Sequence, residues 1–318
     1  MLNNNIIPAN ASSIKIASNI LRENGIISFP TETVYGLGAS ALSSDAIAKI
    51  YAVKKRPRFN PLIVHVSSLK KAKQIGIFNA ETQKLAEIFW PGPLTIVVPI
   101  RENSPISDLV TAGLSTIALR VPSNNIALDL LNYCDIPLAA PSANLSGTVS
   151  PTTAKHVFDD FHDSVDIILD GGRCEYGIES TIILSSKDGF KLLRAGYITE
   201  DIIEKELGII VQKYKSSAII APGQLEKHYA PKAKLRLNAS TLLKDEEFIG
   251  FGKVPDGISS TINLSVNGNL IEAATNLFSI LRSIDDLKLN NVAIAKIPNT
   301  GIGIAINDRL QRAAIQNI

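Results

Sequence analysis

Short apolar runs alternate with helix-like patterns along the first two thirds of the chain. The runs are bounded by Gly, Pro or polar residues, which is typical of buried strands. Strands are predicted at 26–29, 61–66, 94–100, 116–121, 136–140, 165–170 and 180–184. Ser44 or Asp45 can cap a helix that runs to about Lys55, and Pro57 lies just past its end. Strands mixed with helices on this scale predict an α/β sheet covered by helices.

The pattern changes after Leu207, where regular structure is interrupted. Segment 211–233 contains Ala-Pro-Gly at 221–223, His-Tyr-Ala-Pro at 228–231 and several charges. Such a stretch predicts a linker. Beyond it, strands are predicted at 234–237, 247–251 and 291–297, and helices at 269–284 and 304–314. The expected organisation is therefore a first domain of residues 1–210, a linker of residues 211–233 and a small α/β domain of residues 234–318.

The amino-acid composition and net charge are those of a globular protein and do not favour a membrane protein or a general nucleic-acid-binding protein. Apolar residues make up 45% of the 318 positions, enough for a sizeable core, and the formal net charge is only +2. That near balance does not favour bulk nucleic-acid or membrane binding. Cys134 and Cys174 form no CxxC pair, so we expect two buried or partly buried thiols in a reducing compartment. No stretch approaches the ~20 apolar residues of a membrane helix, and no signal peptide is visible, so we expect a cytoplasmic location.

Several familiar catalytic patterns are missing from the sequence. There is no GxxxxGK[ST] phosphate loop, no GxGxxG fingerprint, no HExxH and no GxSxG. The four histidines are scattered, and no metal ligand can be named among the side chains. His65 ends an apolar run, where a lone histidine is more often structural than catalytic on pattern alone.

Three polar segments follow predicted strands or helices. They are Pro-Thr-Glu-Thr-Val-Tyr-Gly-Leu-Gly at 30–38, Lys-Lys-Arg-Pro-Arg-Phe-Asn-Pro at 54–61 and Ala-Ala-Pro-Ser-Ala-Asn at 139–144. Taken singly, each has an ordinary interpretation as a turn or a solvated charge run. Strand exits are however where α/β proteins place ligands, and the glycines of the first segment would let backbone approach one closely. Prolines stiffen the second segment, and fixed cations suit a polyphosphate. Together the segments favour nucleotide binding over acid–base hydrolysis.

These segments resemble the YrdC-type threonylcarbamoyl-AMP synthases. The resemblance rests on residues 30–38, on Lys54-x-Arg56-Pro57 with Pro-Leu-Ile-Val-His at 61–65, on Pro-Ser-Ala-Asn at 141–144 and on Trp-Pro-Gly-Pro-Leu-Thr at 90–95. It spans roughly residues 14–207, and the linker and tail resemble the long, two-domain form of the family. The implied fold is α/β: a twisted, open, mixed YrdC-like sheet around a large cationic cavity, followed by a small Rossmann-like C-terminal domain.

The resemblance also implies roles for individual residues. The catalytic signature would be Lys54, Arg56, Ser142 and Asn144. L-Threonine would be held by Thr33, His65, Arg120, Ala140 and Ser180. ATP would be held by Arg56, Asn60, Thr116, Ser142, Ser150, Arg194 and, from a linker folded over the site, Tyr229.

The implied activity joins L-threonine, bicarbonate and ATP, with Mg²⁺, into threonylcarbamoyl-AMP and pyrophosphate. This is adenylyl transfer to N-carboxythreonine, and tRNA would be reached only indirectly, through a downstream threonylcarbamoyl transferase complex. One alternative is a non-catalytic module that binds double-stranded RNA or the ribosome; the complete Lys-x-Arg and Ser-x-Asn set argues against it. A second is the carbamoyl-AMP-forming domain of hydrogenase-maturation proteins. Those proteins carry acylphosphatase and zinc-finger segments, and two cysteines cannot build such fingers.

Overall fold

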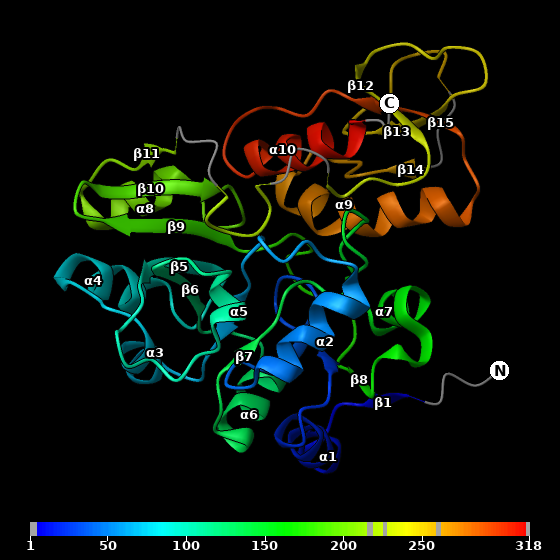
Figure 1. Cartoon of the computed structure of the whole chain (residues 1–318). Helices are drawn as coiled ribbons and strands as arrows, with labels where there is room; N and C mark the ends of the chain where they lie inside the picture. Colours follow the sequence, from blue (N-terminus) through cyan, green and yellow to red (C-terminus); the bar gives the residue numbers. More distant parts are fainter. Residues whose placement is uncertain (1–4, 215–218, 225–227, 259–261, 316–318) are drawn as a thin grey trace.

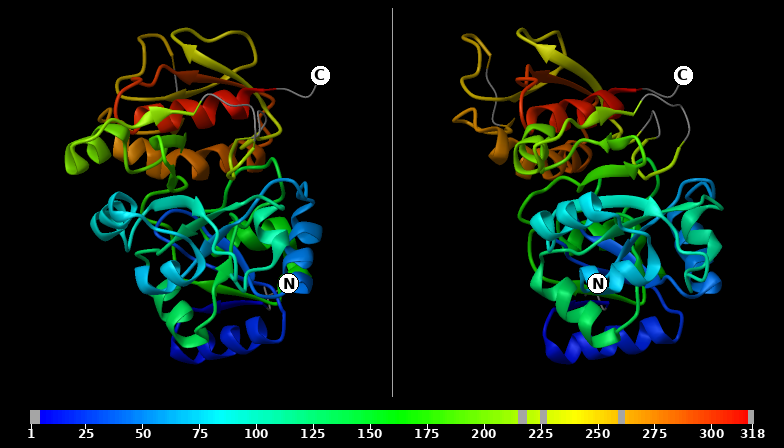
Figure 2. Two further views of the ribbon diagram at one scale, coloured as in Figure 1. Left: turned by 60° about the vertical axis from the view of Figure 1, so that its left-hand side comes forward. Right: turned by 90° about the vertical axis from the view of Figure 1, so that its left-hand side faces the viewer.

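A computed structural model describes residues 5–214, 219–224, 228–258 and 262–315 of the chain. Stretches 215–218 and 225–227 of the predicted linker lie outside these described residues. The chain folds around two β-sheets. In Figure 1 the second sheet and its helices, coloured yellow to red, lie against one side of the first body, coloured blue to green, and the views of Figure 2 agree.

The larger sheet is open and mixed, as the family resemblance implied. Its strand order is β1-β8-β2-β3-β7-β4-β6-β5-β9-β10-β11. Strand β4 pairs in parallel with β6, for example, whereas β5 pairs with β6 antiparallel. The strands are β1 (Ile6–Pro8), β2 (Ile27–Phe29), β3 (Gly36–Ser40), β4 (Ile63–His65), β5 (Leu94–Pro99), β6 (Thr116–Arg120), β7 (Leu138–Ala139), β8 (Ile167–Asp170), β9 (Thr181–Ser186), β10 (Gly189–Arg194) and β11 (Gln212–Lys213).

Helices of the first body begin at residues that cap them. Seven are preceded by Asn, Ser or Thr side chains that accept hydrogen bonds from the first-turn N–H groups, as N-caps do. The cap of α2 is Ser43, so the expectation of Ser44 or Asp45 was wrong by one or two positions. The helices are α1 (Ala11–Arg22), α2 (Ser44–Lys54), α3 (Leu69–Ile75), α4 (Ala80–Phe89), α5 (Asp108–Thr111), α6 (Asn125–Cys134), α7 (Ala154–Phe161) and α8 (Glu200–Leu207), with a 3₁₀ turn, η1 (His162–Ser164).

The C-terminal body is a small parallel α/β unit. Its sheet has the order β12-β15-β13-β14, and each neighbouring pair runs parallel. The strands are β12 (Lys234–Ala239), β13 (Glu247–Gly250), β14 (Ile262–Asn263) and β15 (Asn291–Ala295), and the helices are α9 (Leu270–Asp286) and α10 (Gly303–Ala314). Within the described part of the chain, no helix is both long and apolar enough to cross a bilayer.

Four strands of the large sheet, β1, β3, β10 and β11, were not foreseen. Strand β3 pairs with β2 across residues that the sequence suggested were a glycine loop. A Cβ on Gly38 would come within 2.7 Å of the Phe29 ring, so this glycine makes room for core packing, and the expectation that it meets a ligand was wrong. Strand β11 pairs with β10, so the large sheet extends past residue 210 into the segment predicted as a linker.

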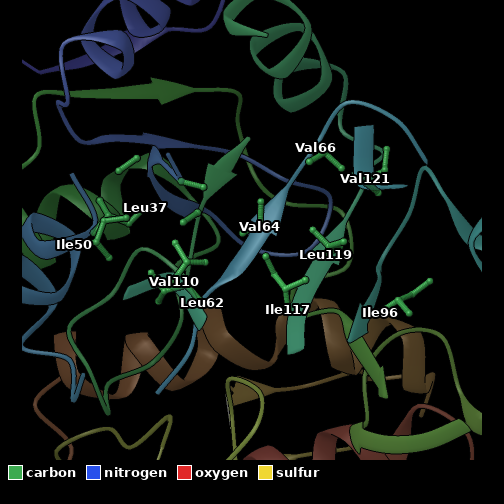
Figure 3. Packing of buried hydrophobic residues seen from close by; sticks show 14 of the residues in the cluster. Leu37, Ile50, Leu62, Val64, Val66, Ile96, Val110, Ile117, Leu119 and Val121 are labelled. Carbon is green, nitrogen blue, oxygen red and sulfur yellow. The ribbon is translucent and has the colours of Figure 1, made fainter. Parts of the chain in front are cut away.

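The main core fixes the strands that reach the cavity described below. Buried residues such as Leu37, Val64 and Leu119 pack between the sheet and α2, α3 and α4 (Figure 3). Because β4 and β6 pair in register, His65 and Arg120 lie side by side at the carboxyl ends of these strands. A closely packed interior resists displacement of its strands, so the backbone positions of His65 and Arg120 are fixed.

We predict that Leu119→Ala lowers the free energy of unfolding by roughly 2–5 kcal/mol, because it leaves a cavity in this core. Leu42→Ala is the matched control: this side chain is 42% exposed, so a change within about 0.5 kcal/mol is expected. Urea unfolding can be followed by fluorescence of Trp90, the chain's single tryptophan, which belongs to the same core. Equal losses in the two variants would contradict the assignment of the core.

Candidate active site

A cationic cavity opens where several strands of the large sheet end. Nine of the residues expected at the site line it: Thr33, Arg56, His65, Arg120, Ala140, Ser142, Ser180, Arg194 and Tyr229. One carboxylate, Glu179, is also in the wall. These residues come from positions 33 to 229 of the chain, so the sheet gathers loops that are far apart in sequence.

Arg56 and Arg194 are held in place by backbone oxygens. Arg56 donates from Nε to the carbonyl of Asn60 (3.1 Å) and from Nη2 to that of Pro61 (2.8 Å). Arg194 donates from Nε to the carbonyl of Ser180 (3.1 Å). Burial, with Arg194 nearby, lowers the pKa of Arg56 to about 10, so its guanidinium is still charged at neutral pH. The site therefore presents fixed positive charges.

Arg120 is oriented by an ion pair with a residue that the site prediction did not include. Its Nη2 lies 2.6 Å from Oε1 of Glu32, and its Nη1 donates to Oγ1 of Thr33 at 3.0 Å. Its Nε donates to the carbonyl of Gly92 at 3.3 Å. Glu32 is 2% exposed and sits between two predicted polar positions of the 30–38 segment, a placement that could have identified it.

Lys54 supports a loop from behind the cavity wall. Its ammonium group donates to the carbonyls of Ser142 (2.5 Å) and Asn144. Ser142 donates through Oγ to Oδ1 of Asn144 (2.6 Å), whose amide donates to the carbonyls of Leu145 and Thr148. Burial holds the pKa of Lys54 well below its usual range. The signature set of Lys54, Arg56, Ser142 and Asn144 is thus brought together, with Lys54 and Asn144 shaping the loop and Arg56 and Ser142 lining the cavity.

His65 and Ser180 offer neutral polar groups to the cavity. His65 is 3% exposed, and burial together with Arg120 holds its pKa well below the usual value, so the imidazole is neutral. Its Nδ1 has no hydrogen-bond partner among the described residues. Ser180 Oγ lies 2.7 Å from Oγ1 of Thr95 and accepts from Nη2 of Arg194 (3.1 Å). An unpartnered buried nitrogen and a hydroxyl in the wall of one cavity suit a small polar ligand.

Three of the expected ATP residues do not line the cavity. Asn60 acts one step behind the wall, through the carbonyl that holds Arg56. Ser150 is also one step behind, because its hydroxyl donates to Oε1 of Glu179 at 2.6 Å. Thr116 begins β6, four residues before Arg120, which places it roughly 13 Å along the strand.

Linker residues close the mouth of the cavity. Pro222, Gly223, His228 and Tyr229 belong to its wall, and Tyr229 is 1% exposed. The free volume of the cavity is only about 40 Å³. Pockets for ligands of nucleotide size enclose roughly 300–1,000 Å³. The linker therefore occupies space that such a ligand would need.

The wall does not provide a metal site of its own. Among the described residues, no three His, Cys, Asp or Glu side chains gather as metal ligands would. Glu179 is already engaged by Ser150 and by Nε of Arg309, which lies 3.2 Å from its Oε2.

Both halves of the chain match known protein families. The family model Sua5/YciO/YrdC, described as telomere recombination, matches residues 19–196, and that of the threonylcarbamoyl-AMP synthase C-terminal domain matches residues 198–315. The chain is 38% identical to threonylcarbamoyl-AMP synthase of Pyrococcus abyssi (95% of this chain, 94% of the relative) and 39% identical to that of Bacillus subtilis (97% and 94%). The crystal structure of P. abyssi Sua5 complexed with L-threonine superposes with a TM-score of 0.89 at 34% identity, covering 97% of both chains. The chain therefore belongs to the Sua5/YciO/YrdC family, in the two-domain form that ends in a threonylcarbamoyl-AMP synthase C-terminal domain.

Proposed function

We propose that this enzyme adenylates N-carboxylated L-threonine, forming threonylcarbamoyl-AMP and pyrophosphate from L-threonine, bicarbonate and ATP. The observation that carries the proposal is the convergence of Arg56, Arg120 and Arg194 with neutral polar groups in one enclosed cavity. Enclosed, preoriented cations stabilise developing negative charge more strongly than solvated ones. Support for the family activity comes from the synthase relatives, which share nearly the whole length of the chain.

L-Threonine would be bound at the Arg120 end of the cavity. The P. abyssi relative was crystallised with this amino acid. A guanidinium has five N–H groups, and the three contacts described for Arg120 use three of them, so its fork can still meet a carboxylate. Thr33, His65 and Ser180, with backbone from Ala140, would contact the amine and hydroxyl. A site that hydrogen-bonds the substrate hydroxyl rejects analogues without it.

Mg·ATP would be bound towards Arg56 and Arg194. Their positive charges would contact the phosphates, and Ser142 would contact the same part of the nucleotide. Lys54 and Asn144 would hold the loop that carries Ser142. Asn60 and Ser150 would act through the wall residues that they contact, and Thr116 and Tyr229 would contact the nucleotide after the linker moves.

The proposed reaction has two bond-forming steps. The neutral threonine amine attacks the carbon of dissolved carbon dioxide, breaking one C–O π bond and releasing a proton, or that of bicarbonate, whose hydroxyl leaves with the amine proton as water; either route gives an N-carboxylate. One oxygen of that carboxylate then attacks the α-phosphorus of ATP, and the bond to the bridging oxygen of the β-phosphate breaks as pyrophosphate leaves. Negative charge grows on the α-phosphoryl and pyrophosphate oxygens, where fixed arginines lower the barrier. The product would then be consumed by a transferase complex that modifies tRNA.

Both the carbamate and the mixed anhydride react with water, so a closable linker has a chemical purpose. Residues 222–223 and 228–229 already cover the cavity, and the small free volume requires them to move before ATP enters. Re-closure would exclude solvent from the intermediate.

The decisive experiment measures pyrophosphate release from ATP by the full chain, with threonine and bicarbonate left out in turn. Release should require both, and threonylcarbamoyl-AMP should appear in equal amount by mass spectrometry. Binding of double-stranded RNA without any use of ATP would instead support the non-catalytic alternative.

We predict that Arg120→Lys raises the KM for threonine roughly 10- to 100-fold, because an ammonium cannot replace a bidentate guanidinium at the carboxylate. The KM for ATP should change less than about threefold, since Arg120 is assigned to the threonine carboxylate and not to the phosphates. Steady-state pyrophosphate release with each substrate varied separates the two effects. An Arg22→Lys variant, on α1 and exposed, serves as the control. A larger effect on ATP than on threonine would show that the two ends have been assigned wrongly.

We predict that Tyr229→Ala lowers the yield of intermediate per pyrophosphate released, because water then reaches the anhydride. The two products are quantified together by chromatography. Tyr133→Ala is the matched control, because Tyr133 is 46% exposed on α6. An undiminished yield in Tyr229→Ala would reject the lid.

A further inference from the structure

The C-terminal body packs its core directly against loops of the active site. Three apolar residues of the first body, Val34, Val149 and Ile178, belong to the same buried cluster as α9 and α10. Each is the sequence neighbour of a residue at the site, namely Thr33, Ser150 and Glu179. The position of the cavity wall therefore depends on the domain behind it.

Arg309 of α10 forms a buried polar link across this interface. It is completely buried, and its Nε lies 3.2 Å from Oε2 of Glu179 while its Nη1 lies 3.0 Å from Oδ2 of Asp308. The other oxygen of Glu179 accepts from the Ser150 hydroxyl at 2.6 Å. The guanidinium also lies over the Tyr229 ring, 5.5 Å from its centroid. One side chain of the C-terminal domain thus touches both the linker and the wall.

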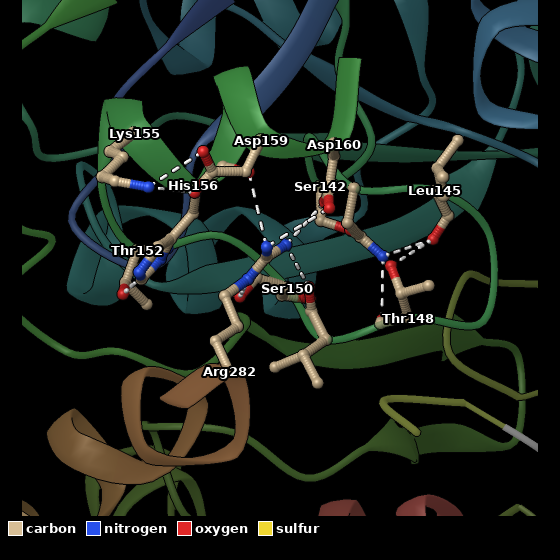
Figure 4. Close-up of polar contacts among 12 residues, drawn as sticks. Ser142, Leu145, Thr148, Ser150, Thr152, Lys155, His156, Asp159, Asp160 and Arg282 are labelled. Atoms are coloured by element: carbon tan, nitrogen blue, oxygen red, sulfur yellow. Dashed lines mark hydrogen bonds and ion pairs between the residues drawn. The ribbon is translucent and has the colours of Figure 1, made fainter. Parts of the chain in front are cut away.

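Arg282 of α9 holds the same loop from the other side. Figure 4 shows it reaching from its helix to Asp160 and to the backbone around Ser150. Its Nη2 donates to the carbonyl of Val149 (2.5 Å) and lies 2.6 Å from Oδ2 of Asp160, and its Nε donates to the carbonyl of Ser150 (3.4 Å). The backbone of Ser150 is therefore anchored by α9, and its hydroxyl, through Glu179, by α10.

We propose that Arg309 is a positioning residue of the ATP site, by which the C-terminal domain fixes Ser150 through Glu179 and seats Tyr229. The inference rests on the proposed function, because it takes Ser150 and Tyr229 to be ATP residues. It gives the C-terminal domain a part in building the site.

The charges explain why this contact matters. Burial alone would raise the pKa of Glu179, but Arg309 and Arg194 lower it, so the carboxylate stays ionised and keeps accepting from Ser150. Without Arg309, Arg194 is the cation that remains near Glu179, and Arg194 is the arginine proposed to bind the phosphates. Glu179 is then no longer held by Arg309, so the Ser150 hydroxyl loses its fixed acceptor. A phosphate of ATP would also compete with Glu179 for Arg194. Both changes weaken ATP binding, and neither removes a hydrogen bond of Arg120.

The test uses Arg309→Met in the full chain. We expect the KM for ATP to rise roughly 10- to 100-fold, the range for loss of a hydrogen bond to a charged group, while the KM for threonine changes less than about threefold. Arg309→Lys keeps the charge and should recover most of the ATP affinity. In a Glu179→Gln background, adding Arg309→Met should raise the KM for ATP by a smaller factor than Arg309→Met does alone, since the path through Glu179 is already broken and only the contact with Tyr229 is lost.

Arg236→Met is the matched control. It breaks an arginine–glutamate pair of the same domain, with Glu246, that has no contact with the cavity wall, and it should leave both KM values unchanged. An unchanged KM for ATP in Arg309→Met, or equal rises for both substrates that follow a loss of thermal stability, would overturn the inference. If Arg309→Met does not fold, Glu179→Gln tests the inference in its place. This variant must raise the KM for ATP more than the KM for threonine. Calorimetric titration with Mg·ATP measures the affinity of the wild type and of each variant for ATP without turnover. If the wild type binds ATP but releases no pyrophosphate when threonine is added, that result contradicts the proposed function and leaves the inference on Arg309 to be judged from the affinities.

Discussion

The site depends on keeping several arginines charged inside a protein wall. A buried cation loses its hydration, and it stays ionised only where oxygens of the protein replace the lost water. Arg56 obtains them from two carbonyls of its own proline-bounded loop, and Arg194 from Ser180. Arg120 instead relies on the carboxylate of Glu32. The rigid turns that present these oxygens therefore matter as much as the arginines themselves.

Lys54 illustrates how a buried basic side chain can serve the fold. Its Nζ lies behind the loop that carries Ser142 and Asn144 and donates to both of their carbonyls. That contact ties the end of α2 to the residues after β7, which are far away in sequence. A lysine and a serine–asparagine pair that look like separate motifs are thus one structural unit, and the unit presents Ser142 to the cavity.

The second body takes part in the same arrangement. Tyr229 of the linker stacks on Phe278 of α9, with ring centroids 5.4 Å apart, and lies under Arg309 of α10. The linker is therefore held between the cavity and the C-terminal helices. Any movement of Tyr229 away from the cavity must break these contacts with that domain, so the position of this linker residue and the packing of the two bodies are coupled.

The sequence determined the elements and the identity of the main polar groups. Apolar runs predicted most strands to within two or three residues, and the 30–38, 54–61 and 141–144 segments supplied Thr33, Arg56 and Ser142, all of which line the cavity. These features are local, so they can be read from spacing and from residue type. Strand β3 was missed because glycines are poor strand formers, and Gly38 is tolerated only because the Phe29 ring fills its place.

Only the tertiary structure decided which polar groups face the cavity and which support it. Lys54, Asn60 and Ser150 act behind the wall, Glu179 and Glu32 are part of the site, and Arg309 reaches it from a different domain. None of these assignments follows from spacing, because each depends on a partner between 4 and 130 residues away that the sheet and the domain interface bring into contact. Burial then sets which of these groups must be paired, and burial is a property of the packed molecule that a linear pattern does not contain.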